Sequence, residues 1–113
     1  MKEAGVVYVA TGTAEVLNPE QGMLRQVLAY SPNMMLVRHR LAKGWVGTSH
    51  RHPHEQLVCV VSGRIEFIGG AKTFILRSGD SVLVEGNVEH QATALDDSEV
   101  LDVFAPCRSD FAQ

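Results

Sequence analysis

The segment Ser49–Gln56 carries the most informative pattern in the chain: it reads Ser-His-Arg-His-Pro-His-Glu-Gln and contains three of the five histidines. In an extended segment alternate side chains lie on the same face, so His50 and His52 point the same way, close enough for two imidazoles to bind one metal ion. Pro53 then forces a bend, because it cannot donate to a β-ladder. Gln56 opens the apolar run that follows, and its parity directs its side chain toward the same interior.

A fourth histidine, His90, lies at the start of a strand-like run far downstream. It completes the site only if the fold brings that strand beside the other two. Imidazole nitrogen suits Zn, Ni, Mn or Fe, and an amide oxygen is a harder, neutral addition. The sequence therefore predicts a divalent transition metal held by His50, His52, Gln56 and His90. The alternative is a loop that is merely rich in histidine.

Two histidines are left outside this predicted ligand set. His39 stands between two arginines on a strand, and we expect it to be either hydrogen-bonded internally or exposed. We expect His54 to be a loop residue that could contact a metal ligand from behind.

The chain around this segment reads as short strands separated by Gly, Pro, Asn and Asp clusters. The predicted strands are Gly5–Ala10, Met23–Tyr30, Met34–Leu41, Gln56–Ser62, Arg64–Ile68, Lys72–Leu76, Ser81–Glu85, His90–Leu95 and Val100–Phe104. Because one hairpin alone is marginally stable, these strands must close or pack sheet on sheet. We expect an all-β, small double-sheet β-barrel forming a single domain over residues 1–113. The first of these strands reads as an edge that a second subunit could cover, which predicts a homodimer.

Composition excludes several classes of partner. The chain has 113 residues, with 10 Lys+Arg against 13 Asp+Glu and a formal net charge of −3. It has no basic excess to neutralise phosphates, so we expect no nucleic-acid partner. The longest aliphatic run, Leu57–Val61, is far shorter than a membrane span, and the first residues do not resemble a secretory signal. With only two cysteines, the expectation is a cytoplasmic protein without a disulfide framework.

The spacing of the histidine segment resembles the first motif of the cupin superfamily. That motif reads Gly, five residues, His-x-His, three or four residues, Glu, six residues, Gly. Here the matching positions are Gly44, His50, His52, Gln56 and Gly63, so every spacing holds and the Glu is replaced by Gln. The resemblance implies the jelly-roll type of small β-barrel.

The second cupin motif is only partly present. It reads Gly, five residues, Pro-x-Gly, two residues, His, three residues, Asn. Gly79 and His90 match, whereas Glu85, Asn87 and Ala94 replace the Pro, Gly and Asn. The neutral Gln56 of the first motif leaves a divalent charge uncompensated by its ligands. We therefore expect Lewis-acid chemistry on an acidic substrate rather than oxygen activation.

The segment 100–111 resembles the C-terminal segment of small single-domain cupins known as pectin-degradation proteins. Members of known activity convert 4,5-unsaturated monouronates into linear keto-uronates. The resemblance implies that Asp102, Phe104 and Arg108 line the pocket of an enzyme with a small acidic substrate. Independently of it, Asp102 and Phe104 share parity and so face one side of the last strand.

Each of these side chains has two interpretations. Asp102 acts as a general acid/base, or it is a carboxylate paired at the barrel rim. Phe104 is an apolar wall for the sugar ring or simple core, and Arg108 holds a substrate carboxylate or lies on the surface. Two other functions also remain open: a cupin oxygenase using Fe or Cu, and a non-catalytic ligand-binding or sensory cupin. Arg64 and Glu66 share a strand face that is either pocket or exterior.

Overall fold

The computed structural model describes residues 2–3 and 5–112, and within them it contains strands and one short 3₁₀ helix. The elements are β1 (Lys2–Glu3), β2 (Val6–Val7), η1 (Thr11–Thr13), β3 (Leu17–Glu20), β4 (Met23–Ser31), β5 (Met34–Leu41), β6 (Glu55–Ser62), β7 (Arg64–Gly69), β8 (Lys72–Arg77), β9 (Ser81–Val84), β10 (His90–Ala94) and β11 (Ser98–Ala105). None of the described residues belongs to a helix that is long and apolar enough to cross a membrane.

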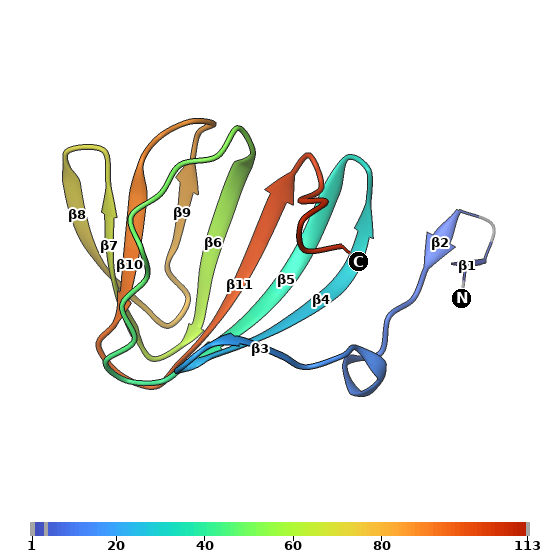
Figure 1. Cartoon of the computed structure of the whole chain (residues 1–113), viewed down its shortest axis with the longest axis horizontal. Coiled ribbons are helices and arrows are strands. Elements are labelled where there is room, and N and C mark those ends of the chain that lie inside the picture. The colour runs from blue at the N-terminus through green and yellow to red at the C-terminus, as the bar shows by residue number, and fades with distance from the viewer. Residues whose placement is uncertain (1, 4, 113) are drawn as a thin grey trace.

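Two antiparallel sheets face each other across the interior (Figure 1). The larger has the order β3-β4-β5-β11-β6-β9 and the smaller the order β10-β7-β8, while β1 and β2 form a separate ribbon. All the named pairings are antiparallel. The predicted all-β double-sheet architecture is therefore confirmed.

The alternating pattern of each strand decides which side chains enter the space between the sheets. On β11 every second residue is buried, namely Ser98, Val100, Asp102 and Phe104. The main apolar core joins residues of both sheets, including Val60 and Ile65, which are almost fully buried. Burial of this apolar area supplies the main favourable free energy of folding. Asp102 is the one charged residue among these buried positions of β11.

The long segment between β5 and β6 places the histidine cluster. It runs along the edge of the small sheet, where isolated bridges join Val46 to Thr93 and His50 to His90. The two backbone hydrogen bonds of the second bridge, at 3.1 and 2.9 Å, fix the two histidines opposite each other. The backbone of His52 is also fixed, because its carbonyl oxygen accepts a hydrogen bond from the backbone amide of Asn87 at 2.8 Å.

Asn87 explains one of the motif departures. It stands where the second cupin motif has Gly and has a φ of 65°, the one positive value at a non-Gly residue among those described. Asn tolerates the left-handed conformation better than most residues, so the turn before β10 survives the replacement.

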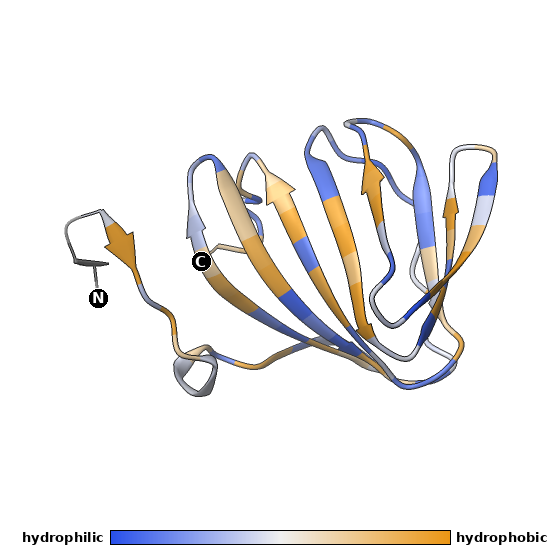
Figure 2. Cartoon of the chain, turned by 180° about the vertical axis from the view of Figure 1, so that it is seen from behind, coloured by the Kyte–Doolittle hydropathy of each residue, from blue (hydrophilic) through white to orange (hydrophobic). Residues whose placement is uncertain are grey.

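The N-terminal prediction was wrong in part. Within the predicted edge strand Gly5–Ala10, only Val6–Val7 forms a strand. It pairs with β1 and not with a strand of the larger or the smaller sheet. One edge of the large sheet is instead β3, which is absent from the predicted strands because Asn18-Pro19 is typical of a turn. Pro is compatible with an edge strand, where its missing N–H costs no ladder bond. β2 lies away from the sheets although it is hydrophobic (Figure 2).

The turn between β6 and β7 depends on glycine. Gly63 has a φ of +92°, and a Cβ there would lie 2.2 Å from Ser98 Oγ and 2.5 Å from the Asp97 carbonyl oxygen. Gly79 has the same φ within a degree, +91°, but a Cβ there would meet nothing within 4 Å. We expect Gly63→Ala to lower the free energy of unfolding by about 3 kcal/mol or more, and Gly79→Ala by only about 1 kcal/mol. Urea unfolding measures both, and equal losses would contradict the steric explanation.

Candidate functional site

Three imidazoles meet at one point between the sheets. A nitrogen from each of His50, His52 and His90 lies within 4.8 Å of the corresponding nitrogens of the other two. The ring centroids are 5.4 Å apart for His50 and His52, 4.5 Å for His50 and His90, and 4.9 Å for His52 and His90. His52 and His90 are buried, whereas His50 remains exposed at the mouth. The predicted convergence of these three side chains is therefore observed.

Backbone carbonyls fix the tautomer of all three rings. The Nδ1 atoms of His50, His52 and His90 lie 2.9, 3.0 and 2.8 Å from the carbonyl oxygens of residues 48, 54 and 88. A carbonyl can only accept, so each Nδ1 carries the proton and donates it. In a neutral ring the Nε2 atom then has no proton. Three lone pairs consequently face a shared point, the orientation that metal-binding histidines adopt.

The surroundings of these Nε2 atoms fit a cation. His90 Nε2 is buried without a hydrogen-bond partner. His52 Nε2 lies 3.0 Å from Gln56 Oε1, which places one acceptor against another. Buried polar atoms are normally satisfied, and two acceptors attract each other only through a cation between them. The donor set of three neutral imidazoles and one amide oxygen therefore fits a divalent transition metal.

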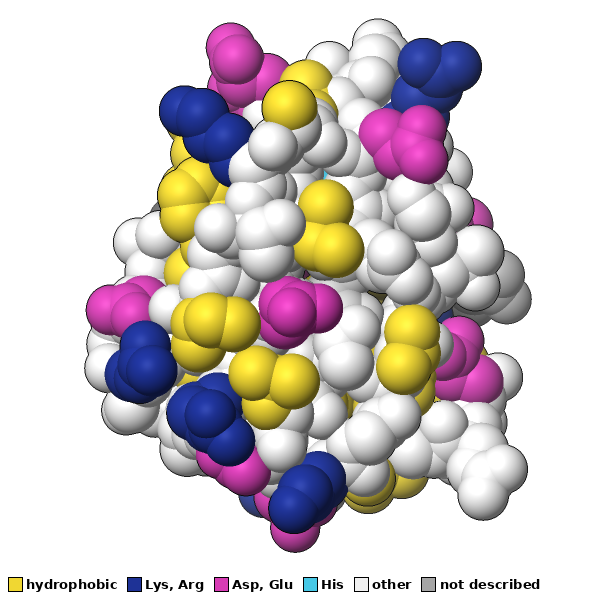
Figure 3. Space-filling model, turned by 90° about the vertical axis from the view of Figure 1, so that its left-hand side faces the viewer, with side chains coloured by type: hydrophobic (Ala, Val, Ile, Leu, Met, Phe, Trp, Pro, Cys, Tyr) yellow, Lys and Arg dark blue, Asp and Glu magenta, His cyan; other side chains and the backbone are white. Residues whose placement is uncertain are grey.

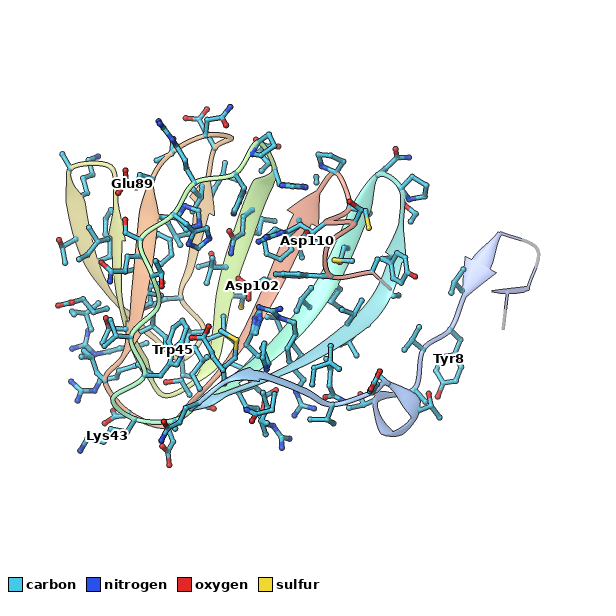
Figure 4. All side chains as sticks on the ribbon, viewed as in Figure 1. Tyr8, Lys43, Trp45, Glu89, Asp102 and Asp110 are labelled. Atoms are coloured by element: carbon cyan, nitrogen blue, oxygen red, sulfur yellow. The ribbon has the colours of Figure 1, made fainter. Side chains whose placement is uncertain are left out.

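A hydrogen-bonded row runs from the cluster across the inner face of the large sheet. Gln56 Nε2 donates to Asp102 Oδ1 at 2.8 Å, and Asp102 Oδ2 lies 2.7 Å from His39 Nδ1. His39 Nε2 in turn accepts from Arg25 Nε at 3.0 Å. These residues come from β6, β11, β5 and β4, which are neighbours in the sheet. Asp102 lies in the interior between the sheets (Figure 4).

A cavity of about 270 Å³ opens beside the cluster and this row. Its polar lining includes His50, His90, Gln56, Asp102 and Arg108. Its apolar lining comes from both sheets, the loop between β5 and β6 and the segment after β11: Met23, Leu41, Trp45, Val58, Ile65, Phe67, Ala92, Val100, Phe104 and Phe111. Hardly any His side chain shows from the side of the small sheet, as Figure 3 illustrates. The cluster thus lies inside the barrel, in a space large enough for a small molecule.

Two guanidinium groups make one wall of the cavity cationic. The Cζ atoms of Arg25 and Arg108 lie 3.8 and 4.0 Å from the ring centroid of Phe111. Arg108 also forms a two-point ion pair with Asp110, with nitrogen–oxygen distances of 2.7 and 3.2 Å. Burial lowers the pKa of Arg25, and the neighbouring Arg108 charge lowers it further. Asp110 partly offsets the charge of Arg108, and the remaining positive charge of the two guanidinium groups favours an anionic ligand.

Burial also lowers the pKa of two imidazoles in the cluster. For His52 the Arg108 and His90 charges add to this effect, while Gln56 Oε1, which would accept a hydrogen bond from the protonated ring, opposes it and raises the pKa. For His90 the hydrogen bond to the Val88 carbonyl opposes it, raising the pKa, and the His50 charge lowers it. Both shifts keep the rings neutral, the form that binds metal.

We expect the metal-free protein to lose stability as the pH falls. The folded-state pKa values of His52 and His90 lie below the reference of 6.5, so the unfolded chain binds more protons. This stabilisation is complete above the unfolded pKa and declines from about pH 6.5 downward. Urea midpoints between about pH 8 and pH 5 measure the decline. The control replaces both histidines with Gln, and an unchanged decline in that variant would contradict the assignment.

The other predicted site residues are also placed at the cavity. Phe104 is buried, with its ring centroid 5.8 Å from that of His52, and Arg108 is half-buried on the cavity wall. The side chain of His54 lies behind the cluster, 5.4 Å from His52 between ring centroids. Arg64 and Glu66 do not line the cavity: their strand turns Ile65 and Phe67 inward, and Arg64 pairs with Asp96 at 2.6 Å outside.

Sequence reasoning missed Arg25, His39 and Phe111 as parts of this site. The sequence did contain a pattern that indicates burial of His39. This residue lies on the same strand face as Met35, Val37 and Leu41, and all four side chains are buried. The arginines on either side, Arg38 and Arg40, fall on the opposite face. Of the two outcomes expected for His39, an internally hydrogen-bonded side chain is the one observed.

Comparisons with known proteins agree with this architecture. The family model described as a cupin domain matches residues 37–104. The pectin degradation protein KdgF of Dickeya dadantii (strain 3937) is 35% identical over 92 residues, which span 80% of this chain and 84% of the relative.

Two solved structures are similar over almost the whole chain. KdgF from Halomonas sp. superposes with a TM-score of 0.89 at 32% identity and covers 93% of this chain and 99% of that one. An RmlC-like cupin from Shewanella frigidimarina NCIMB 400 has a TM-score of 0.89 at 30% identity, covering 92% of this chain and 94% of the other. The chain therefore belongs to the cupin family and resembles the pectin-degradation protein KdgF within it.

Proposed function

We propose that this protein is a metal-dependent enzyme that converts a 4,5-unsaturated monouronate into its linear keto-uronate. The observation that carries the proposal is that Asp102 and Arg108 line the same cavity as His50 and His90 of the three-imidazole cluster. The identity to a pectin degradation protein supports the substrate class. The cavity, with its cationic wall and apolar lining, has the character that a small sugar acid requires.

The metal centre in this proposal consists of His50, His52, His90 and Gln56 holding a divalent Zn, Ni, Mn or Fe ion. Bound there, the ion would supply Lewis-acid polarisation of substrate oxygens. Arg108 would hold the uronate carboxylate by charge-assisted hydrogen bonds. Phe104 would form the apolar wall beside the sugar ring. These assignments place the reacting carbon atoms between the metal centre and the carboxylate of Asp102.

Asp102 is assigned proton transfer. Both of its oxygens accept hydrogen bonds, from Gln56 and His39, which hold the carboxylate in a fixed position on the cavity wall, where it would exchange a proton with water and substrate. Water oxygen adds to C5 of the enol ether and a proton is delivered to C4. The C5–ring-oxygen bond then breaks to give the ketone, and the C1 hydrate releases one water. The product is thus an isomer of the substrate, with one water consumed and one released.

The test is an assay of protein purified without a His tag, after its metal content has been measured. Incubation with an unsaturated monouronate should abolish the ultraviolet absorbance of the conjugated double bond, and mass spectrometry should show a product of unchanged mass. A chelator should stop the reaction and added metal should restore it. Consumption of oxygen would instead indicate the oxygenase alternative. Tight binding without turnover, equal with and without metal, would indicate a ligand-binding cupin.

We also propose a homodimer. Val6, Val7 and Tyr8 are 65%, 46% and 75% exposed on a segment that projects from the barrel (Figure 4). The outer face of the large sheet also carries apolar side chains, since Leu57 and Leu83 are paired in register and about half exposed. Light scattering should give twice the chain mass. The single domain over residues 1–113 and the cytoplasmic location stay predictions.

A further inference from the structure

We propose that Arg25 and His39 are positioning residues of the metal centre, which act through Asp102 to present the oxygen of Gln56, rather than its nitrogen, to the metal. This inference rests on the metal centre of the proposed function. It concerns two residues that touch neither the imidazole cluster nor, in the proposed chemistry, the reacting carbon atoms.

Because Arg25 can only donate, it determines which atom donates and which accepts in every hydrogen bond of the row. A guanidinium has only donors, so Arg25 Nε–H donates to His39 Nε2, which must carry a lone pair. The His39 proton is therefore on Nδ1, and it is donated to Asp102 Oδ2 at 2.7 Å. A second proton on His39 would set two N–H groups against each other at 3.0 Å.

Asp102 in turn determines the orientation of the Gln56 amide. With Oδ2 occupied by His39, Asp102 directs Oδ1 toward Gln56, and an ionised carboxylate only accepts. The Gln56 NH₂ group must therefore face Asp102 at 2.8 Å. Its Oε1 is left facing His52 Nε2. An amide can otherwise turn over and offer its NH₂ group, which cannot bind a metal.

Burial makes this constraint effective. His39, Gln56 and Asp102 are 7%, 9% and 5% exposed, so little solvent competes for their hydrogen bonds. Arg25 is itself held between the His39 ring and the Phe111 ring. The row also places a carboxylate charge one hydrogen bond from Gln56, which partly restores the charge that a Glu ligand would supply. Groups that orient a metal ligand in this way commonly change metal affinity by about 10–100-fold.

The test is a double-mutant cycle on Zn²⁺ affinity, measured by competition with a chromogenic chelator. His39→Leu removes both hydrogen bonds of the ring, and we expect it to weaken Zn²⁺ binding at least about tenfold. His39→Asn keeps a donor at the place of Nδ1 and should retain affinity within about threefold. Gln56→Met removes the oxygen ligand, and in that background His39→Leu should change affinity less than about twofold.

Arg25→Met provides a second route if His39→Leu does not fold, as judged by far-ultraviolet circular dichroism. This substitution removes the donor that keeps the His39 proton on Nδ1. It should weaken Zn²⁺ binding about threefold or more, again only when Gln56 is present. Two outcomes would overturn the proposal: His39→Leu and Arg25→Met lower Zn²⁺ affinity equally with and without Gln56, or they do not lower it when Gln56 is present. Because Zn²⁺ affinity needs no sugar, a wild-type protein that fails to convert unsaturated monouronates would refute the proposed function while leaving this cycle decisive.

Discussion

His90→Ala should reduce the metal content of the purified protein from about one ion per chain to nearly none. His90 supplies a buried Nε2 that has no hydrogen-bond partner, and its Nδ1 proton is committed to the Val88 carbonyl. Without this ligand the remaining donors are His50, His52 and Gln56. Loss of the metal should lower turnover of an unsaturated monouronate on the order of a thousandfold, the equivalent of several kcal/mol of transition-state stabilisation. Inductively coupled plasma mass spectrometry measures the metal.

His54→Ala is the matched control for this prediction. Its ring lies beside the cluster but outside the set of converging nitrogens, and the hydrogen bond that it accepts from His52 is through its backbone carbonyl. The substitution keeps that carbonyl, so metal content should remain near one ion per chain. Full metal content in His90→Ala, or equal loss in both variants, would contradict the assigned ligand set.

Assayed at saturating metal, Asp102→Asn should lower kcat by about 10²–10⁴-fold, the usual contribution of a general acid/base. Asn preserves the shape of the side chain and can still accept from Gln56, but it carries no charge and cannot take up a proton. Asp102 is buried and lines the cavity, whereas Glu20, the other carboxylate that lines it, accepts a hydrogen bond from Trp45 Nε1 at 2.6 Å. The rate is measured with metal at saturation, which separates proton transfer from metal binding.

Asp96→Asn serves as the control, because Asp96 is a partly exposed carboxylate that pairs with Arg64 outside the cavity. Its turnover should equal that of the wild type. If Asp102→Asn also turned over at the wild-type rate with metal bound, Asp102 would have no part in proton transfer. Its carboxylate would then serve only to hold Gln56 and His39.

The strands and the cluster could be predicted from sequence because they depend on local pattern. Alternating burial in β5 and β11 follows the period of two in their sequences, and Met34–Leu41 was predicted to the residue. The pair His50 and His52 needed only an extended backbone. Adding His90 required the family spacing, since strand periodicity alone does not reveal which distant strand becomes a neighbour.

What could not be predicted depends on contacts between distant segments. Arg25 reaches His39 because β4 and β5 align these two residues directly opposite each other. Phe111 lies after the last strand, where no periodicity applies, yet its ring packs against both arginines. The predicted edge strand Gly5–Ala10 failed for the same reason: its apolar composition is typical of a strand but does not identify a pairing partner.

The sequence of β6 does not indicate which of its faces is buried. Gln56–Ser62 carries apolar residues on both faces, a pattern typical of a strand covered from two sides, but Leu57 and Val61 are 49% and 41% exposed on the outer face of the sheet. A single chain therefore buries only the side of β6 that faces the cavity. Composition alone does not separate a strand buried within one chain from a strand with an apolar outer face.

Anomalous diffraction from crystals of untagged protein tests the metal centre most directly. The account predicts one anomalous peak in the cavity, at about 2.0–2.2 Å from Nε2 of His50, His52 and His90 and with Gln56 Oε1 turned toward it. A peak bound by other residues, or a fully metal-supplemented crystal with no peak among these imidazoles, would contradict it.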